Sequence, residues 1–331
     1  MDIRLGVVMD PIGSITVYKD STLAMLLAAQ RRGWRLSYME LADLVLDRER
    51  PCGRMRDLVV DDNPQQWYHL GAETREPLEA LQVILMRKDP PFDMDFIYTT
   101  YILERAAVEG VYVSNRPNSL RDVNEKLYTS WFSEFCPPTL VTTSSERLKD
   151  FIRHHGDAII KPLDGMGGAG IFRLTPDDPN INIILEHSTL NDSRQIMAQR
   201  YVPEIKDGDK RVLVVNGKAV PYALARIPAQ GETRGNLAAG GRGVPVAIGD
   251  KERRIVDAVS PYLLERGLLF VGLVVIGSYL TEINVTSPTC VRELDAFMHK
   301  EASVDVAAKN GYIPGIADSY LDAVEAAMNH S

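Results

Sequence analysis

The stretch FVGLVVIGSYLTEINVTSPT, residues 270–289, predicts two strands joined by a tight turn, and its second strand carries Glu282 and Asn284 two positions apart. Side chains at positions i and i+2 of a strand point to the same face, so two oxygen ligands converge there. They form half of a site for a hard cation such as Mg²⁺. A third oxygen ligand is expected on the first strand, opposite these two, but that position holds Val274.

Upstream lies a second hairpin, RVLVVNGKAVPYALAR, which begins at Arg211. Its Asn-Gly pair at 216–217 separates two alternating runs and predicts a two-residue type I′ turn. Counting outward from this turn places Arg211 opposite Tyr222, and Arg226 shares their face. Asp209 lies beside them if no bulge intervenes. The sequence therefore predicts two arginines and a carboxylate on one side of one sheet.

A lysine followed by several glycines marks another candidate binding element, KPLDGMGGAGIF at residues 161–172. Lys161 ends a predicted strand, and glycines permit positive φ angles that let backbone N–H groups approach phosphate oxygens. The stretch is not a Walker sequence, and no GxGxxG opens a helix after the first strand. A flexible hairpin loop is the alternative interpretation. The glycines are Gly165, Gly167, Gly168 and Gly170.

The glycine-rich stretch GETRGNLAAGGRG, residues 231–243, cannot form a stable helix or strand. We predict that this stretch is a loop that closes as a lid, and the family resemblance described below implies that the lid spans 227–243. Arg234 and Asn236 within it suit an anionic substrate or phosphate. A solvent-exposed linker is the alternative, although linkers more often carry serine and lysine.

The stretch LMRKDPPFD, residues 85–93, ends a predicted strand in Arg87. In an open α/β sheet, ligands bind outside the carboxyl ends of the strands. Arg87 is therefore placed to hold a substrate carboxylate. Taken alone, the stretch is also compatible with an ion cluster at the surface.

The composition is that of a globular protein of 331 residues, 45% of them hydrophobic. Lys and Arg number 37 against 45 Asp and Glu, a net charge of -8, which disfavours non-specific attraction to nucleic acid or to an anionic membrane. No signal peptide or membrane span is predicted, so the expected location is the cytoplasm. Three widely spaced cysteines indicate neither a disulfide framework nor a zinc site.

The pattern along the chain divides it into three parts. Residues 1–123 alternate strands and helices, which predicts an α/β domain with a parallel sheet. Residues 124–203 predict a small α+β lobe. Residues 204–331 are rich in hairpins and end in a predicted helix.

Seven stretches, taken in order, closely resemble the bacterial glutathione synthetase family, whose members are ATP-grasp ligases. The resemblance runs from residue 3 to about 296. It implies an ATP-grasp fold preceded by an N-terminal parallel-sheet (pre-ATP-grasp) domain. It also implies that γ-glutamylcysteine is joined to glycine with ATP and Mg²⁺, and that the protein is a homo-oligomer, a tetramer. The stretches are VMDPIGSI, LMRKDPPFD, SLRDVNEKLYTSWF, KPLDGMGG, KDGDKRVLVV, ARIPAQGETRGNLAAGGRG and TEINVTSPT.

The resemblance also implies roles for individual residues. The residues expected to bind the phosphates and adenine of ATP are Lys126, Lys161, Gly167, Gly168, Gln199, Tyr201 and Val202. Those expected at the reaction centre are Asp209, Arg211 and Arg226. Those expected to hold the peptide substrate are Arg87, Arg234 and Asn236. Those expected to bind metal are Glu282 and Asn284.

One position departs from the family pattern, because the first strand of the hairpin normally reads Gly-Leu-Asp and here the aspartate is Val274. For Val274 to face Glu282, we predict a three-residue turn over 277–279; a two-residue turn pairs Val274 with Thr281 instead. Valine has no lone pair, so one metal site is expected to be weakened or lost and catalysis impaired, with ATP binding partly retained. A nearby carboxylate that compensates is the alternative, and the strand itself provides none.

The chain also departs from the family after about residue 297, where the tail matches poorly. The tail either reshapes the acceptor pocket or is a surface elaboration. Two other functions therefore stay open beside glutathione synthesis. One is a paralogous carboxylate-amine ligase with a different acceptor, and the other is a non-catalytic ATP-binding homologue.

Overall fold

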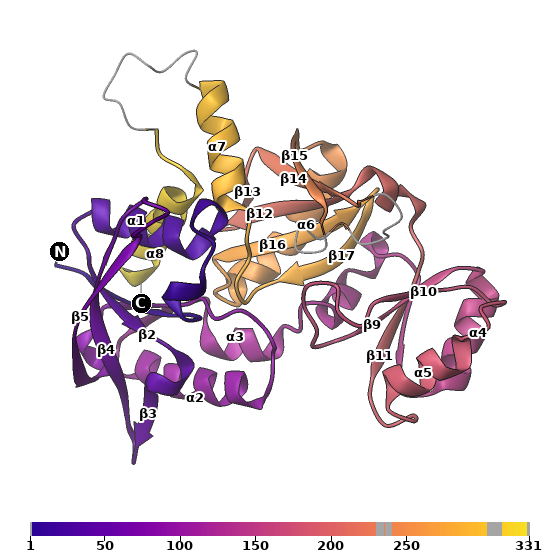
Figure 1. Ribbon diagram of the computed structural model, residues 1–331, viewed down its shortest axis with the longest axis horizontal. Helices are drawn as coiled ribbons and strands as arrows, with labels where there is room; N and C mark the ends of the chain where they lie inside the picture. Colours follow the sequence, from indigo (N-terminus) through magenta and orange to yellow (C-terminus); the bar gives the residue numbers. More distant parts are fainter. Residues whose placement is uncertain (1, 230–234, 236–239, 303–312, 330–331) are drawn as a thin grey trace.

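The computed structural model describes residues 2–229, 235, 240–302 and 313–329, and its strands form three sheets (Figure 1). The first sheet lies beside the third, and the second sheet with its helices forms a separate lobe on the far side of the third sheet. No helix among the described residues is long and apolar enough to cross a membrane.

The N-terminal sheet has seven strands in the order β3-β4-β2-β1-β6-β7, with β5 paired to the outer edge of β4. The pairs β2/β1, β1/β6 and β6/β7 are parallel, as predicted, but β3, β4 and β5 add an antiparallel extension that the sequence pattern did not predict. The strands are β1 (Arg4–Val8), β2 (Arg35–Met39), β3 (Leu44–Asp47), β4 (Arg50–Val60), β5 (Tyr68–Pro77), β6 (Val83–Met86) and β7 (Tyr112–Ser114).

Local capping explains where the helices of this lobe begin. The Asp20 carboxylate accepts a hydrogen bond of 2.6 Å from the N–H of Leu23 at the start of α1 (Ser21–Arg31). Asp93 accepts one of 2.9 Å from Phe96 at the start of α2 (Met94–Val108). Each carboxylate satisfies an N–H group that has no partner within the helix, and each suits the positive end of the helix dipole.

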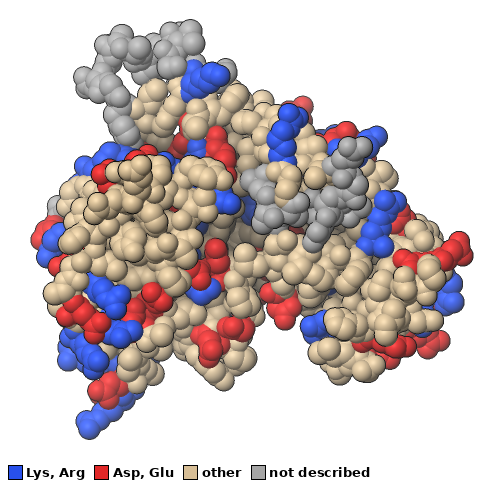
Figure 2. All heavy atoms as spheres, viewed as in Figure 1, with Lys and Arg blue, Asp and Glu red and all other residues tan. Residues whose placement is uncertain are grey.

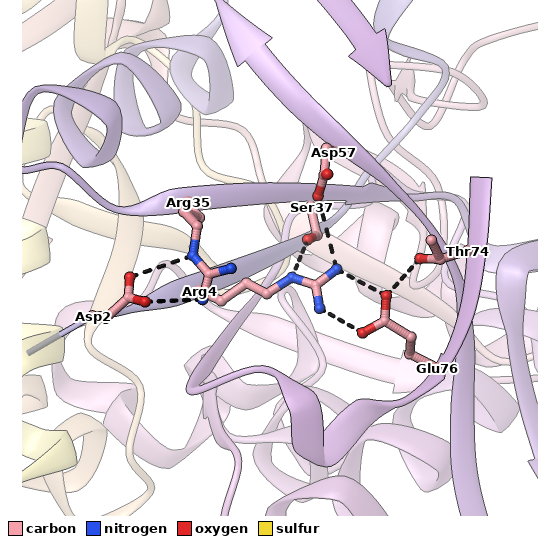
Figure 3. Close-up of polar contacts among 7 residues, drawn as sticks. All are labelled: Asp2, Arg4, Arg35, Ser37, Asp57, Thr74 and Glu76. Carbon is pink, nitrogen blue, oxygen red and sulfur yellow. Dashed lines mark hydrogen bonds and ion pairs between the residues drawn. The ribbon is translucent and has the colours of Figure 1, made fainter. Parts of the chain in front are cut away.

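A polar network joins the antiparallel extension to the parallel strands (Figure 3). The Arg4 guanidinium on β1 binds Ser37 on β2 at 2.9 Å and Glu76 on β5 at 2.6 Å. Thr74 donates a further hydrogen bond of 2.6 Å to Glu76. The hydrogen bonds from Arg4 and Thr74 lower the pKa of Glu76, so the carboxylate stays charged and keeps β5 attached.

The second sheet is antiparallel, in the order β10-β9-β11-β8. Two helices cover one face and bury Leu148, Ile160 and Leu185 against it. Because side chains alternate along a strand, Lys161 and Gln199 point from the opposite face. The elements are β8 (Thr139–Thr142), α4 (Ser145–His155), β9 (Ala158–Pro162), β10 (Phe172–Leu174), α5 (Ile181–Thr189) and β11 (Ile196–Arg200).

The third sheet has the order β15-β14-β12-β16-β17, with the short β13 paired to β12. Buried apolar side chains of this sheet pack in one cluster with side chains of α2, α3 and α6. The elements are α3 (Pro117–Asp122), β12 (Asp209–Val215), β13 (Lys218–Ala219), β14 (Tyr222–Ile227), β15 (Arg242–Ala247), α6 (Asp250–Glu265), β16 (Phe270–Ile276), β17 (Tyr279–Asn284) and α7 (Val291–Ala302).

The last helix, α8 (Ile316–Met328), returns to the first lobe and packs against α1. Tyr320 is buried and donates a hydrogen bond of 2.7 Å to Ser114 at the end of β7. Arg32 forms an ion pair of 2.7 Å with Asp322. The chain therefore ends on the lobe in which it begins (Figure 1).

Candidate functional site

One cavity of about 720 Å³ lies where the three sheets approach one another, and most predicted site residues line it. It brings together every predicted site residue that the structure describes: Arg87, Lys126, Lys161, Gly167, Gly168, Gln199, Tyr201, Val202, Asp209, Arg211, Arg226, Glu282 and Asn284. Outside the cavity, positive and negative residues are interspersed on the visible face (Figure 2). The positive charge that a phosphate ligand needs is therefore local to the cavity.

The hairpin around residues 216–217 has the predicted turn, because Asn216 and Gly217 both have positive φ angles, 48° and 72°. The predicted partner of Arg211 was wrong. Arg211 pairs with Leu224 rather than Tyr222, because the ladder is interrupted at Pro221, which has no N–H to donate. The shift is two residues, which keeps every side chain on its face.

That shift places Asp209 directly opposite Arg226, and the two side chains form an ion pair of 2.5 Å. Both are buried at the cavity wall. Burial alone lowers the pKa of Arg226, but the Asp209 carboxylate outweighs it and raises the pKa. Arg226 is therefore a fixed cation held in one orientation.

Arg211 is buried two residues along the same strand, and its Nε has no hydrogen-bond partner among the described residues. Burial, with the charge of Arg226 as a second cause, lowers the pKa of Arg211. A Cβ built at Gly272 would lie 2.6 Å from the Arg211 guanidinium, so glycine at this position leaves room for the guanidinium where it stands. The fold thus keeps a desolvated guanidinium with unused donors, which suits an anionic ligand.

Two lysines from different parts of the chain line the cavity, Lys161 on β9 of the second sheet and Lys126 in the segment that packs beside β17. Lys161 is buried and donates a hydrogen bond of 3.2 Å to the carbonyl of Thr281. Lys126 is also buried and donates one of 2.6 Å to the carbonyl of Gly165. Burial, with the nearby charge of Lys126 as a further cause, lowers the pKa of Lys161 to about 8. Both ammonium groups line the same cavity as the arginines.

The glycine-rich loop between β9 and β10 uses backbone conformations that other residues rarely adopt. The φ angles of Gly167, Gly168 and Gly170 are 67°, 81° and 70°. Gly167 and Gly168 line the cavity beside the two lysines. The loop is therefore shaped by glycine where a phosphate cradle was predicted.

The turn of the β16/β17 hairpin differs from the prediction. It contains two residues, Gly277 and Ser278, since Ile276 pairs with Tyr279. Val274 nevertheless faces Glu282, because a β-bulge inserts Thr281 as an extra residue on β17.

The bulged residue is bound from the second sheet, because the carbonyl of Thr281 accepts a hydrogen bond of 3.2 Å from Lys161. The Thr281 hydroxyl donates a hydrogen bond of 3.2 Å to the carbonyl of Val274. The bulge therefore aligns Arg211, Val274 and Glu282 as cross-strand neighbours on the cavity face.

Glu282 and Asn284 supply the oxygen atoms that a divalent cation could use. Burial alone raises the pKa of Glu282, but the charges of Lys126, Lys161, Arg211 and Arg226 outweigh it and lower the pKa, which keeps the carboxylate ionised. Asn284 donates its amide to the carbonyl of Gly272 at 3.1 Å, which leaves its oxygen free for a ligand. Val274 is buried and offers no lone pair.

These donors fit a divalent cation only in part. Among the residues that the structure describes, no three His, Cys, Asp or Glu side chains are grouped so that they could hold a metal ion. The remaining ligands of a cation held by Glu282 and Asn284 must come from a bound substrate and water.

Arg87 lies at the end of the cavity formed by the first lobe. Its guanidinium donates to Thr22 at 3.2 Å and to the carbonyl of Pro288 at 2.9 Å, and it lies 5.5 Å from the ring of Phe270. Burial lowers the pKa of Arg87. Asp20 lines the same end of the cavity.

The strand predicted to bind adenine also lines the cavity. Gln199 donates a hydrogen bond of 3.1 Å to Thr139, and Val202 is buried. The guanidinium of Arg173 stacks 3.8 Å from the ring of Tyr201. These contacts fix the side chains of Gln199 and Tyr201 at the cavity wall.

Sequence reasoning missed Glu125. Its carboxylate accepts hydrogen bonds from the N–H of Val285 at 2.9 Å and from the N–H and hydroxyl of Thr286 at 3.1 and 2.8 Å. Glu125 thereby fixes the segment that follows Asn284. Its position next to Lys126 in the chain was the signal available.

The predicted substrate residues Arg234 and Asn236 lie outside the described residues, as does much of the loop 227–243. Gly235 between them is described and lines the cavity. A Cβ at Gly235 would lie 2.4 Å from the carbonyl oxygen of Arg226 and 3.0 Å from the Asp209 carboxylate. Only glycine fits this close to the ion pair.

Comparison with known proteins gives consistent similarities. Residues 3–121 match the family model of the prokaryotic glutathione synthetase N-terminal domain, and residues 125–299 match that of its ATP-grasp domain. The chain is 60% identical over 295 residues to glutathione synthetase from Pseudomonas aeruginosa, covering 89% of this chain and 93% of that protein. It is 59% identical over 294 residues to the one from Photorhabdus laumondii, covering 89% and 93%.

Solved structures with low sequence identity share the fold. A D-cycloserine synthetase matches with a TM-score of 0.64 at 13% identity, covering 98% of this chain and 99% of that one. D-alanyl-alanine synthetase A from Vibrio cholerae matches with a TM-score of 0.58 at 14% identity, covering 99% of both.

Proposed function

This chain belongs to the prokaryotic glutathione synthetase family and is an ATP-dependent carboxylate-amine ligase, and we propose that it joins γ-glutamylcysteine to glycine. One observation carries the proposal. Four cationic residues, Lys126, Lys161, Arg211 and Arg226, are buried around Glu282 in a single cavity. Such a group of desolvated cations suits a polyphosphate and the charges that develop on it during phosphoryl transfer.

In the first half-reaction, the carboxylate of the cysteine residue of γ-glutamylcysteine attacks the γ-phosphorus of ATP. An acyl phosphate forms and ADP leaves. Lys126 and Lys161 hold the phosphates, while Arg211 and Arg226 stabilise charge on the transferred group. Arg87 is placed to hold a carboxylate of the dipeptide.

In the second half-reaction, the amine of glycine attacks the acyl carbonyl and loses a proton. The tetrahedral oxyanion collapses, the amide bond forms and inorganic phosphate leaves. Arg211, with its unused donors, stabilises the oxyanion. Since this role is electrostatic, the chain needs no nucleophilic side chain.

Glu282 and Asn284 are the residues that would hold Mg²⁺, which neutralises phosphate charge when it is bound. The valine at position 274 removes the third protein ligand that the family pattern supplies. We propose that one metal site is weakened for this reason. ATP still binds through the lysines and the glycine-rich loop.

The test of this function is product analysis with the purified protein, ATP, Mg²⁺, γ-glutamylcysteine and glycine. We expect ADP and glutathione to form in equal amounts. A panel of other amines, assayed in parallel, identifies the acceptor. ADP release that requires a different amine would assign the chain to a ligase with another acceptor, and no amide product with any amine would contradict ligation.

Replacing Gly235 by alanine is expected to lower kcat at least tenfold, because the new methyl group collides with the backbone of Arg226 and moves the chain away from the Arg226–Asp209 pair. The Kd for ATP should change little, since the lysines are untouched. Steady-state kinetics and ATP titration separate the two effects. Gly240→Ala is a control, because a Cβ there meets nothing within 4 Å, although its positive φ adds some strain.

The affinity for ATP is expected to fall as the pH rises above about 8, because the Lys161 ammonium has its pKa near 8 and loses its charge there. Below that pH the lysine is protonated and the affinity should be constant. Above it the Kd should rise by up to about tenfold per pH unit. Titration of ATP from pH 7 to 10 measures this, and Lys161→Arg should flatten the curve. An unchanged affinity across this range in the unaltered protein would contradict the assignment.

We also propose that the protein is a homo-oligomer, as the resemblance to the family implies, with four subunits. Sedimentation equilibrium at micromolar concentration tests the number of subunits.

A further inference from the structure

The guanidinium of Arg87 rests on an aromatic ring as well as on hydrogen bonds. Its two hydrogen bonds go to uncharged partners, the hydroxyl of Thr22 and the carbonyl of Pro288. Its central carbon lies over the ring of Phe270, 5.5 Å from the ring centroid. A ring in this position attracts the guanidinium and limits where it can move. The orientation of Arg87 therefore depends on where the Phe270 ring stands.

Tyr320 of α8 packs against that same ring. The ring centroids of Phe270 and Tyr320 are 5.1 Å apart, the ring planes are tilted by 43°, and both side chains are buried. Aromatic rings at such a separation attract one another beyond the area that they bury. Burial raises the pKa of Tyr320 to about 12, and the nearby charge of Arg87 opposes that rise. Tyr320, Phe270 and Arg87 therefore form a continuous row of side chains.

The end of β7 holds both rings of this row. The Tyr320 hydroxyl donates a hydrogen bond of 2.7 Å to Ser114, and at neutral pH the phenol keeps the proton that it donates. Asn115 binds the backbone of Phe270, because its oxygen accepts from the N–H at 3.1 Å and its amide donates to the carbonyl at 2.8 Å. The backbone of Phe270 is thus held independently of Tyr320. Loss of Tyr320 would free the Phe270 ring and leave its strand in place.

The helix that carries Tyr320 lies outside the cavity wall. No described residue of α8 lines the cavity, and α8 begins after residue 299, where the match to the family model ends. The tail was expected either to reshape the acceptor pocket or to be a surface elaboration. The row from Tyr320 to Arg87 favours a third role, in which the tail acts on the end of the cavity formed by the first lobe.

We propose that Tyr320 is a positioning residue for the dipeptide: it holds the ring of Phe270, and that ring holds the Arg87 guanidinium where a substrate carboxylate binds. The inference rests on the proposed function, in which Arg87 holds that carboxylate. Removing the Tyr320 ring leaves space into which the Phe270 ring can turn, since a core closes such a cavity only in part. Arg87 then loses a fixed support, and a displacement of about 1 Å is enough to weaken a positioned contact.

The first test measures the KM for each substrate in Tyr320→Met and Tyr320→Phe. Methionine suits a helix and adapts to irregular core space, but it has no ring to hold Phe270. We expect the KM for γ-glutamylcysteine to rise about tenfold in Tyr320→Met, with kcat and the KM for ATP changed by less than about twofold. Tyr320→Phe keeps the ring and should retain the KM of the unaltered protein.

The matched control is Val324→Ala, at a fully buried position one turn further along α8. It should lower the Tm and leave the KM for the dipeptide unchanged, because it weakens the packing of α8 without removing a ring. Phe270→Leu tests the row from β16 and should raise the KM for the dipeptide by a similar factor. This second variant keeps the test decisive if Tyr320→Met does not fold.

A double-mutant cycle shows whether Tyr320 acts through Arg87. Arg87→Met alone should raise the KM for the dipeptide by about 100-fold, and adding Tyr320→Met should raise it no further. A full additional rise in the double variant would overturn the positioning role and leave the proposed function intact. So would an unchanged KM in both Tyr320→Met and Phe270→Leu. An unchanged KM in Arg87→Met would overturn both the positioning role and the assignment of Arg87 to the dipeptide.

Discussion

Replacing Val274 by aspartate is expected to raise kcat by about 100-fold, because it places a carboxylate beside Glu282 at the position where the family pattern has a metal-binding aspartate. Val274 lies between Arg211 and Glu282 as their cross-strand neighbour. Cβ atoms of such neighbours lie about 5 Å apart. An aspartate at position 274 therefore reaches the same region as the Glu282 carboxylate.

The change should appear in metal dependence as well as in turnover. The concentration of Mg²⁺ needed for half-maximal activity should fall, and Mn²⁺ titration with ATP bound should detect a second site. The Kd for ATP without metal should stay within a fewfold. Since Val274 is buried, the thermal stability of the variant must be measured alongside.

Val274→Asn is the matched control, because it has the size of aspartate without the charge. It should give a smaller gain. If the aspartate variant and the unaltered protein form glutathione at the same rate and with the same Mg²⁺ dependence, another group compensates for the valine. The proposal that Val274 weakens a metal site is then wrong. If the new aspartate forms an ion pair with Arg211 instead of binding metal, the thermal stability of the variant should rise and its affinity for Mg²⁺ should not.

Local sequence signals were sufficient for several features of the site. The Asn-Gly pair at 216–217 fixes its turn because both residues tolerate positive φ. The glycines after Lys161 identify the loop for the same reason. Alternation along β12 places Asp209 and Arg211 on the cavity face, and the register shift of two residues leaves them there. Alternation along β17 likewise keeps Glu282 and Asn284 on one face.

Features that depend on distant contacts could not be predicted. Thr281 in the bulge is bound by Lys161 from another sheet, a contact that the hairpin sequence does not reveal, and the longer turn was expected only from the likeness to the family. The antiparallel strand β4 buries Pro51, Gly53 and Met55 on its inner face, and these residues do not form a typical strand pattern. The return of α8 to α1 is likewise a tertiary contact without a local signal.

Replacing Arg211 by methionine is expected to lower kcat by about 1000-fold, because it removes the buried cation whose donors have no described partner. The effect should fall on kcat more than on the Kd for ATP, since Lys126 and Lys161 remain. Arg211→Lys keeps the charge but loses the planar fork of donors, so it should recover only part of the rate.

The same substitution should leave the fold at least as stable, which distinguishes a catalytic role from a structural one. Burial lowers the pKa of Arg211, which means that the folded protein holds this charge at a cost. An apolar side chain of similar length removes that cost, and such replacements stabilise proteins by up to about 4 kcal/mol. We therefore expect the Tm of Arg211→Met to be equal or higher while synthesis is nearly lost. A lower Tm with a proportionate loss of activity would mean that Arg211 supports the sheet instead, and the unpaired guanidinium would then need another explanation.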